Sequence, residues 1–504
     1  MPETAASSEL AQKASIELAT SRMRESLQGH AARLLDKTIF FSLLTLIALI
    51  AIPSGKGTLW WDAAFECAVF ALGVLWIIHC FLSGVWRVAG KNLLAPLLAL
   101  MVFACVQTLP LSSANTIEGI ESVAWRAVSA DPYETRLFIF KLLALTLAGA
   151  LLLRYTSHRS RLRTLIHVVI GVGVASALFG IMRQAIQDGE WKLTLYSPSR
   201  ARWHYLVVWV DFLSLRLGEG YGQFGNRNHF TFLMEMTLGL ALGLIAGGGV
   251  RRNRLPVYLV AAALVWTALV FTTSRGAIFS MFSQVIFIAL FVTGRRPLRE
   301  TPKRLNGALS RWSRISRSNI TRIILVLCLV VAVSIGVVYV GGDPLMNRLE
   351  TVPGELTAGD TTERTGARRI EIWHATWQLI KANPVAGVGF GGYWVAIPAY
   401  HDASGVWTPE QAHNDYLELL ASGGLIGAAL GTWFIVALIR RARERLQATD
   451  SFRHAACLGA LAGLCGVAVH SLFDYGLHIT INALVFTVLI AIAVVDGRFE
   501  KTAS

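Results

Sequence analysis

The chain has 504 residues, of which 54% are hydrophobic and only 15% are charged, and its formal net charge is +14. A soluble domain usually has about 25% charged residues, so this composition excludes an ordinary soluble protein. The basic residues lie in short loops between apolar blocks, which indicates orientation in a membrane and argues against nucleic acid as a partner. None of the six cysteines is part of a CxxC pair, so neither a disulfide framework nor a zinc site is expected.

Apolar blocks of about 20 residues predict helices that cross a bilayer with a hydrocarbon core about 30 Å thick. We therefore expect an all-α polytopic membrane protein with about 12 transmembrane helices and no cleaved signal peptide. The predicted spans are 38–54, 62–82, 92–110, 135–153, 162–183, 228–248, 256–272, 276–294, 321–340, 415–438, 454–471 and 478–496.

Basic residues are concentrated in alternate loops, and twelve spans place all of these loops on one side. By the positive-inside rule that side is the cytoplasm, and both termini lie there. The chain is expected to divide into a cytoplasmic extension (1–37), spans 1–9 (38–340), a large periplasmic loop (341–414), spans 10–12 (415–496) and a cytoplasmic tail (497–504).

Two long loops fall on the outer face. Residues 184–226 are rich in aromatic side chains, which suits either an interface belt or sugar stacking. Within the larger loop, "ARRIEIWHATWQLIKANP" (367–384) has apolar residues at helical spacing and ends at an Asn-Pro pair. This segment predicts an amphipathic helix that lies along the membrane surface or packs on the bundle without crossing the membrane.

Three predicted spans begin on the outer face with an ionisable residue. Their starts are "GNRNHF" (225–230), "TTSRGA" (272–277) and "AHNDYL" (412–417), which carry Arg227, Arg275 and His413. A helix N-terminus has unpaired N–H groups and a partial positive charge, so an arginine there is unfavourable without an anion. Arginine binds phosphate through two parallel hydrogen bonds, so the three starts together predict an anion site.

Plainer interpretations stay open for each residue alone. An arginine at a span end commonly anchors the helix at the headgroups, and a histidine there is commonly an interface residue. The other histidines in or next to spans are interpreted as helix-packing residues: His79, His167 and His470.

The combination nevertheless has a chemical use. We expect the helix N-terminus and nearby arginines to favour a neutral His413 imidazole, which can accept a proton. A proton acceptor beside two phosphate-binding arginines suggests transfer of a group from a diphosphate to a hydroxyl. No motif on this face has metal-ligand spacing, so metal-independent chemistry without a cofactor is expected.

At these residues the chain resembles the O-antigen ligase and O-antigen polymerase superfamily. The similar segments are "GNRNHF", "TTSRGA", "HNDYLELLASGGLIG" and "RRIEIWHATWQLIKANPVAGVGFGGYW", and their order, spacing and common side make the set specific. The resemblance covers most of the chain. It does not include the 37-residue N-terminal extension or the basic cytoplasmic loop 295–317.

The resemblance implies a metal-independent, inverting glycosyltransferase of the bacterial inner membrane with a periplasmic active site. Its donor would be a polyprenyl (undecaprenyl) diphosphate-linked glycan, bound through Arg227 and Arg275, and His413 would be the candidate base. The neighbouring substrate-binding residues would be Asn226, Asn228, Ser274, Asn414, Tyr416 and Arg369.

The acceptor stays open between lipid A–core (a ligase), another lipid-linked glycan (an O-antigen or exopolysaccharide polymerase) and a protein hydroxyl (a protein O-oligosaccharyltransferase). A lipid-linked glycan transporter would also use a basic cavity, but it predicts charged residues near mid-span and paired broken helices. A purely structural membrane scaffold would not explain why Arg227, Arg275 and His413 all lie on the same face of the membrane.

Overall fold

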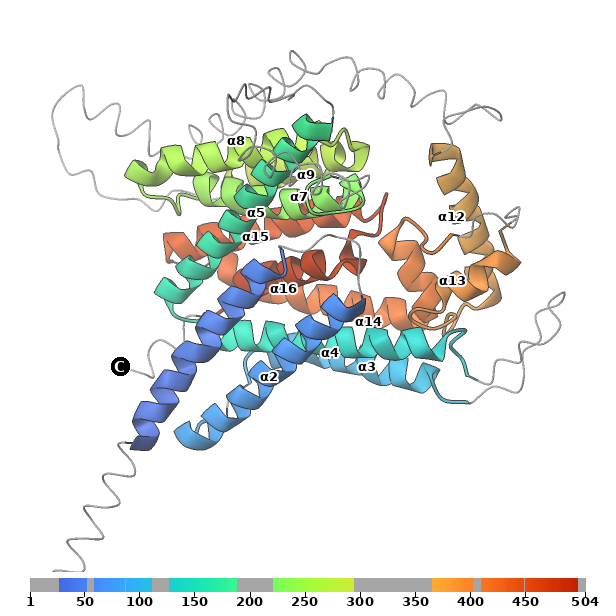
Figure 1. Cartoon of the computed structure of the whole chain (residues 1–504), viewed down its shortest axis with the longest axis horizontal. Helices are drawn as coiled ribbons and strands as arrows, with labels where there is room; N and C mark the ends of the chain where they lie inside the picture. The colour runs from blue at the N-terminus through green and yellow to red at the C-terminus, as the bar shows by residue number, and fades with distance from the viewer. Residues whose placement is uncertain are drawn as a thin grey trace, which may run out of the picture.

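The computed structural model describes residues 27–51, 59–86, 88–110, 127–187, 221–293, 365–401, 409–447 and 449–496. All regular elements in these ranges are helices, which confirms the predicted all-α class (Figure 1). The first helix covers 27–49. The longer helices that follow are α2 (Leu59–Ser83), α3 (Lys91–Gln107), α4 (Pro132–Tyr155), α5 (Arg159–Gln187), α7 (Arg227–Ala246), α8 (Leu255–Phe271), α9 (Arg275–Thr293), α12 (Thr365–Ala382), α14 (Asp415–Leu446), α15 (Ser451–His470) and α16 (Thr480–Val494).

Eight helices of the described part are long and apolar enough to cross a membrane, so the chain is a multi-pass membrane protein. Two more apolar helices, α3 and α16, are shorter. The count of twelve spans stays a prediction, and the predicted span 321–340 lies outside the described residues. Two boundaries differ from expectation. The first helix already covers residue 27, and α14 continues to Leu446 instead of ending at 438.

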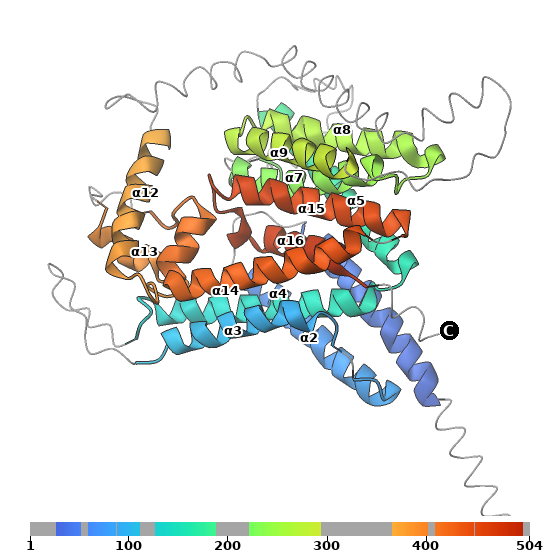
Figure 2. The same cartoon turned by 180° about the vertical axis from the view of Figure 1, so that it is seen from behind.

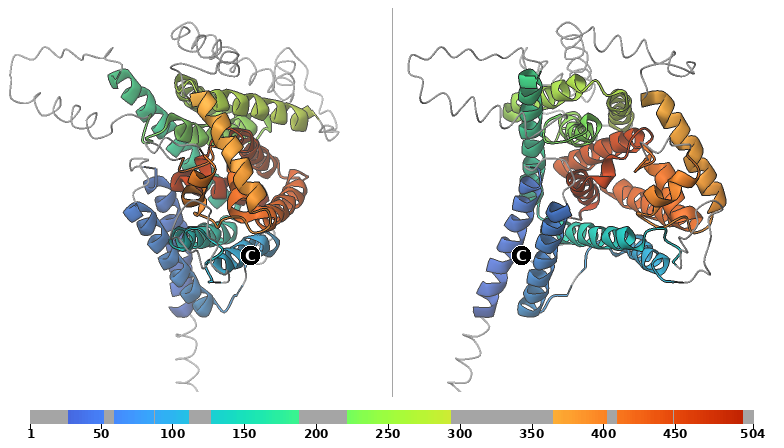
Figure 3. Two further views of the ribbon diagram at one scale, coloured as in Figure 1. Left: turned by 90° about the vertical axis from the view of Figure 1, so that its right-hand side faces the viewer. Right: turned by 45° about the vertical axis from the view of Figure 1, so that its right-hand side comes forward.

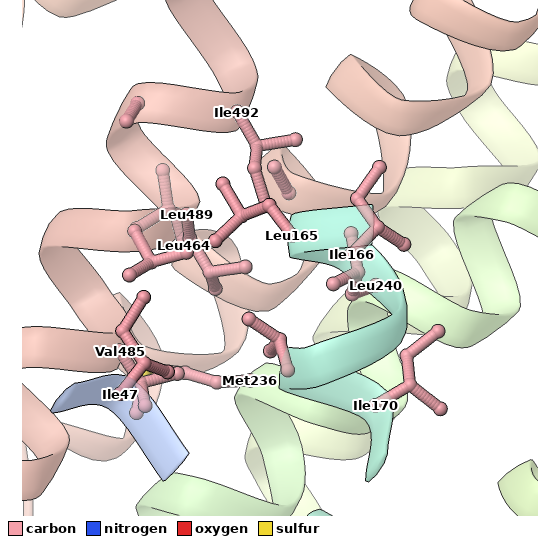
Figure 4. Packing of buried hydrophobic residues seen from close by; sticks show 14 of the residues in the cluster. Ile47, Leu165, Ile166, Ile170, Met236, Leu240, Leu464, Val485, Leu489 and Ile492 are labelled. Atoms are coloured by element: carbon pink, nitrogen blue, oxygen red, sulfur yellow. The ribbon is translucent and has the colours of Figure 1, made fainter. Parts of the chain in front are cut away.

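Helix α7 is the central element of the bundle. From His229 to Ala246 every residue is buried, so the helix is covered by protein on all sides. Side chains from α5, α15, α16 and the helix 27–49 pack around it, including Leu165, Leu464, Leu489 and Ile47 (Figure 4). A helix without an exposed polar face lies in a protein core or spans a membrane, and here other helices surround it. The first residue of α7, Arg227, is therefore attached to a well-fixed support.

Helices α7 and α15 are in backbone contact along a line of glycines. A Cβ atom at Gly239 would lie 2.4 Å from the backbone N of Gly463, and one at Gly243 would lie 2.2 Å from Cα of Gly459. Small residues permit this close approach in membranes, where packing replaces the hydrophobic effect as the main attraction between helices.

Gly243→Val is expected to force α7 and α15 apart and to destabilise the bundle by about 1–3 kcal/mol or more, because overpacking cannot be relieved against backbone. The check is the thermal unfolding midpoint of the protein purified in detergent. The matched control is Gly171→Val on α5, where an added Cβ meets no neighbouring atom within 4 Å. Equal losses at both positions would contradict this account of the glycine contact.

Helix α14 is interrupted near its start by an inserted turn. Gly424 has φ 57° and ψ −158° inside the helix, a combination that favours glycine. The freed amides of Leu425 and Ile426 donate to the carbonyls of Pro384 (2.8 Å) and Val385 (3.2 Å). The turn after α12 thus satisfies the broken hydrogen bonds of α14, which fixes the outer-loop segment to the bundle.

Helix α12 lies crosswise at one end of the bundle, and the short α13 (Tyr393–Ala396) lies beside it (Figures 1 and 2). Seen along the bundle, α12 passes across the ends of the other helices (Figure 3). It is not one of the eight candidate spans. Nε1 of Trp373 donates to the carbonyl of Ala412 at 3.0 Å, so α12 is in contact with the segment that leads into α14.

Candidate active site

The carboxylate of Asp474 joins three of the predicted site residues. Asp474 lies in the turn between α15 and α16, and its side chain is 1% exposed. Oδ1 lies 3.3 Å from Nδ1 of His413, and Oδ2 accepts from Nδ2 of Asn228 at 2.5 Å and from Nη2 of Arg369 at 3.3 Å. The beginning of α7, helix α12 and the segment before α14 therefore meet at one acidic group.

Asp474 is ionised. Burial by itself would raise the pKa of this carboxyl, but the hydrogen bond with His413 and the positive charge of Arg369 outweigh it and lower the pKa below its ordinary value. The carboxylate state contributes stability above the pKa of an unfolded aspartate, and this contribution is lost as the pH falls through the lowered value. At neutral pH the group therefore offers a full negative charge to His413.

His413 is held in an unusual conformation by its surroundings. Its φ is 49°, in the left-handed region that non-glycine residues seldom adopt, and such conformations cluster at functional sites. Its ring lies edge-on to Tyr475, with centroids 4.8 Å apart. Because Nδ1 faces a carboxylate, Nδ1 carries the proton in the neutral ring, and Nε2 is then the acceptor nitrogen.

The structure adds to this environment a group that the sequence did not single out. The sequence predicted positive groups around His413, and the carboxylate of Asp474 also contacts its ring. Asp474 comes from the turn between the last two helices, and its partners lie far away in the sequence. An imidazole backed by a carboxylate is oriented by it.

Asn414 and Tyr416 connect the His413 segment to α15. Oδ1 of Asn414 caps α14 by accepting from two backbone amides, and its Nδ2 donates to the carbonyl of Leu472 at 2.9 Å. The hydroxyl of Tyr416 donates to the carbonyl of Ala468 at 2.7 Å. Both side chains, predicted to bind substrate, make contacts that fix the position of His413.

The two predicted arginines begin adjacent helices. Arg227 and Arg275 are the first residues of α7 and α9, both half-buried. Nη1 of Arg227 lies 3.4 Å from Oγ1 of Thr273, a residue with φ 51°. The two helix N-termini are therefore neighbours, which places two guanidinium groups and the positive ends of two helix dipoles in one region.

The remaining predicted residues shape these helix starts. Oδ1 of Asn226 caps α7 by accepting from the amide of Asn228 at 2.9 Å. Ser274 is buried, and its amide donates to Oγ1 of Thr272 at 3.4 Å. Together these contacts explain why short polar residues flank the two arginines.

Another imidazole near Tyr475, that of His478, lies close to two carboxyl groups. Nε2 of His478 is 3.4 Å from Oε1 of Glu418 and 3.8 Å from Oδ1 of Asp415. Desolvation lowers the pKa of His478, the Asp415 charge opposes this, and the Lys141 charge adds to the lowering. His478 was missed because the predicted span 478–496 included it, whereas α16 begins at Thr480.

Within the described ranges no group of three or more His, Cys, Asp or Glu side chains is placed to hold a metal ion. Metal-independent chemistry stays a prediction, because it is inferred from the sequence motifs alone.

Comparison with known proteins identifies one region. Residues 259–432 match the family model described as O-antigen ligase. No curated protein matches the chain. The matched region includes Arg275, Arg369 and His413, and it covers most of α8, all of α9 and α12, and the first part of α14. The resemblance to the O-antigen ligase superfamily is thereby confirmed for this region, which contains three of the four similar segments, whereas "GNRNHF" lies before it.

Proposed function

We propose that this protein transfers a glycan from polyprenyl diphosphate to a hydroxyl acceptor such as lipid A–core at the periplasmic face of the bacterial inner membrane. The observation that carries the proposal is the meeting of Asn228, Arg369 and His413 at Asp474, beside the neighbouring N-termini that bear Arg227 and Arg275. The match of residues 259–432 to the O-antigen ligase model supports glycan and lipid-linked substrates in general terms.

The mechanism follows from the roles of these groups. The acceptor oxygen attacks the anomeric carbon, the bond from that carbon to the diphosphate oxygen breaks, and polyprenyl diphosphate leaves with both bonding electrons. Nε2 of His413 takes the acceptor proton, and Asp474 stabilises the resulting imidazolium. Arg227 and Arg275 stabilise the charge that develops on the diphosphate. Attack from the face opposite the leaving group inverts the anomeric configuration, and no metal ion takes part.

The acceptor distinguishes a ligase from its alternatives. The test is the lipopolysaccharide banding pattern of a strain that lacks this gene, with polyprenyl-linked glycan extracted in parallel. Loss of all O-chain from lipid A–core, with long polymer accumulating on polyprenyl diphosphate, supports the ligase. Core that carries a single repeat indicates a polymerase. An unchanged pattern overturns both and directs attention to exopolysaccharide or protein acceptors.

The proposed orientation puts both termini in the cytoplasm. It is supported by the basic residues of alternate loops, including those at 251–254 and 440–445. A single cysteine introduced at position 410, in the segment before His413, should react with a membrane-impermeant thiol reagent added to intact spheroplasts. A cysteine at position 252 should react only after the membrane is opened.

Arg275→Lys is expected to raise the KM for the donor on the order of 10- to 100-fold, because lysine keeps the charge but cannot form two parallel hydrogen bonds with phosphate. The measurement is the initial transfer rate at varied donor concentration in nanodiscs. The matched control is Arg254→Lys, an exposed arginine just before α8. An unchanged donor KM in Arg275→Lys would remove Arg275 from diphosphate recognition.

A further inference from the structure

Two ionisable side chains face each other inside the helix bundle, within a few turns of the candidate active site. Glu235 of α7 is 0% exposed and His470 of α15 is 1% exposed. Oε2 of Glu235 lies 3.0 Å from Nδ1 of His470. Ionisable groups among spanning helices are costly to bury, so their presence calls for a function. Neither residue has a part in the mechanism above.

His470 is joined to Asp474 through the backbone. His470 is the last residue of α15, and its carbonyl accepts from the amides of Phe473 at 2.8 Å and Asp474 at 3.2 Å. The turn that carries the Asp474 carboxylate therefore begins on the residue whose side chain pairs with Glu235. A shift of the His470 backbone would move Asp474 and, with it, the partner of His413.

The imidazole of His470 is also in contact with the beginning of α9. A Cβ atom at Gly276 would lie 2.6 Å from both Cδ2 and Nε2 of this ring. Gly276 directly follows Arg275, so the ring packs against the backbone that carries the arginine. The contact explains the glycine of the "TTSRGA" segment, because any side chain there would displace the ring or the helix start.

Residues of α7 that follow Asn228 also contact the His470 ring. Phe232 stacks on the His470 ring with centroids 4.3 Å apart. Oγ1 of Thr231 lies 3.5 Å from Nδ1 of His470 and donates to the carbonyl of Asn228 at 2.6 Å. From α9, Nε2 of Gln284 donates to the backbone carbonyl of Glu235 at 2.9 Å. The pair thus lies where α7, α9 and α15 meet.

We propose that Glu235 and His470 are positioning residues that set the location of Arg275 relative to Asp474 and His413. This inference rests on the proposed function. Glu235, fixed on the buried helix α7, holds the imidazole, and the imidazole holds both the start of α9 and the turn after α15. Small displacements of groups that align a donor and a base reduce rates strongly, so the effect appears in transfer and not only in folding.

The first experiment measures kcat and KM in nanodiscs with a polyprenyl-diphosphate-linked glycan as donor, per folded molecule. Glu235→Ala and His470→Ala are expected to lower kcat/KM on the order of 10- to 100-fold. Glu235→Gln is expected to restore part of this loss, because its amide oxygen still accepts from the imidazole. The matched control is His79→Ala, which removes another buried imidazole, hydrogen-bonded to Tyr155 at 3.0 Å between α2 and α4, and should leave kcat/KM unchanged.

The second experiment uses the contact with Gly276. Gly276→Ala alone is expected to reduce kcat/KM, because the added methyl meets the ring. In the His470→Ala background the ring is absent, so Gly276→Ala should cause little further loss, a non-additivity that two independent sites would not show. Additive losses, or losses that vanish once activity is divided by the folded fraction, overturn the inference. If His470→Ala does not fold, the difference in kcat/KM between Glu235→Ala and Glu235→Gln tests the inference by itself.

Binding of radiolabelled polyprenyl diphosphate to the same nanodiscs separates this inference from the proposed function. A wild-type protein that neither binds this probe nor transfers glycan overturns the proposed function. A wild-type protein that does both, with Glu235→Ala equal to it, overturns only the positioning role.

Discussion

His413→Ala is expected to lower the rate of glycan transfer on the order of 10²- to 10⁴-fold while the protein remains folded in the membrane. The loss follows from the placement of the ring, with Nδ1 3.3 Å from a buried carboxylate and Nε2 as the nitrogen that accepts a proton. Alanine provides no proton acceptor, and Arg227 and Arg275, which are proposed to bind the donor, are unaffected. The expected pattern is therefore a lower kcat with a nearly unchanged KM for the donor.

The measurement is single-turnover transfer by purified protein in nanodiscs. The control is His167→Ala, whose ring contacts Tyr258 between α5 and α8, away from the candidate site. Transfer by His413→Ala at the wild-type rate would show that another group takes the acceptor proton. His478, which contacts Tyr475 and lies 3.4 Å from Glu418, would then be the next residue to substitute.

Asp474→Asn is expected to lower kcat roughly 10²- to 10⁴-fold, because the amide keeps the size of the side chain but removes the charge that stabilises a protonated His413. The lost charge also leaves Arg369, 3.3 Å away, without its anionic partner. The lowered pKa of Asp474 means that the carboxylate is present throughout the pH range in which the enzyme is assayed. The pH–rate profile of the wild-type protein should therefore show no titration of Asp474 near neutral pH.

The matched comparison is Asp62→Asn, a carboxylate in another ion pair, with Lys141, on helices α2 and α4. It should reduce transfer much less than Asp474→Asn does. If Asp474→Asn and Asp62→Asn lose activity equally, and in proportion to the folded fraction, Asp474 is a structural residue and does not assist His413. A kcat loss confined to Asp474→Asn is the expected result.

The sequence predicted the helices well because each is a long apolar block between polar punctuation. The predicted start at 276 and the observed start of α9 at Arg275 agree closely, as do 228 and Arg227 for α7. The break at Gly424 could not be predicted, because it depends on carbonyls of a turn some 40 residues earlier in the chain. Length and hydropathy predict where a span lies, but they do not show which backbone groups from elsewhere in the chain bind to it.

The candidate site was predicted in part. Arg227, Arg275 and His413 stood out because each begins a span on one face, and helix polarity then brings them to the same end of the bundle. Asp474 was missed because it lies in a short turn and gains its importance from Asn228, which is 246 positions away. A carboxylate between the last two spans was the available signal, but its partners emerge only from the packing of α7 against α15.

The glycine contact between α7 and α15 has a mechanical consequence. A bilayer that thickens, thins or bends changes the tilt of single helices independently. Two helices in backbone contact at Gly239, Gly243, Gly459 and Gly463 have no deformable side-chain layer between them and tilt together. Arg227 begins one of these helices and Asp474 follows the end of the other. We therefore expect their separation to be insensitive to lateral stress in the membrane.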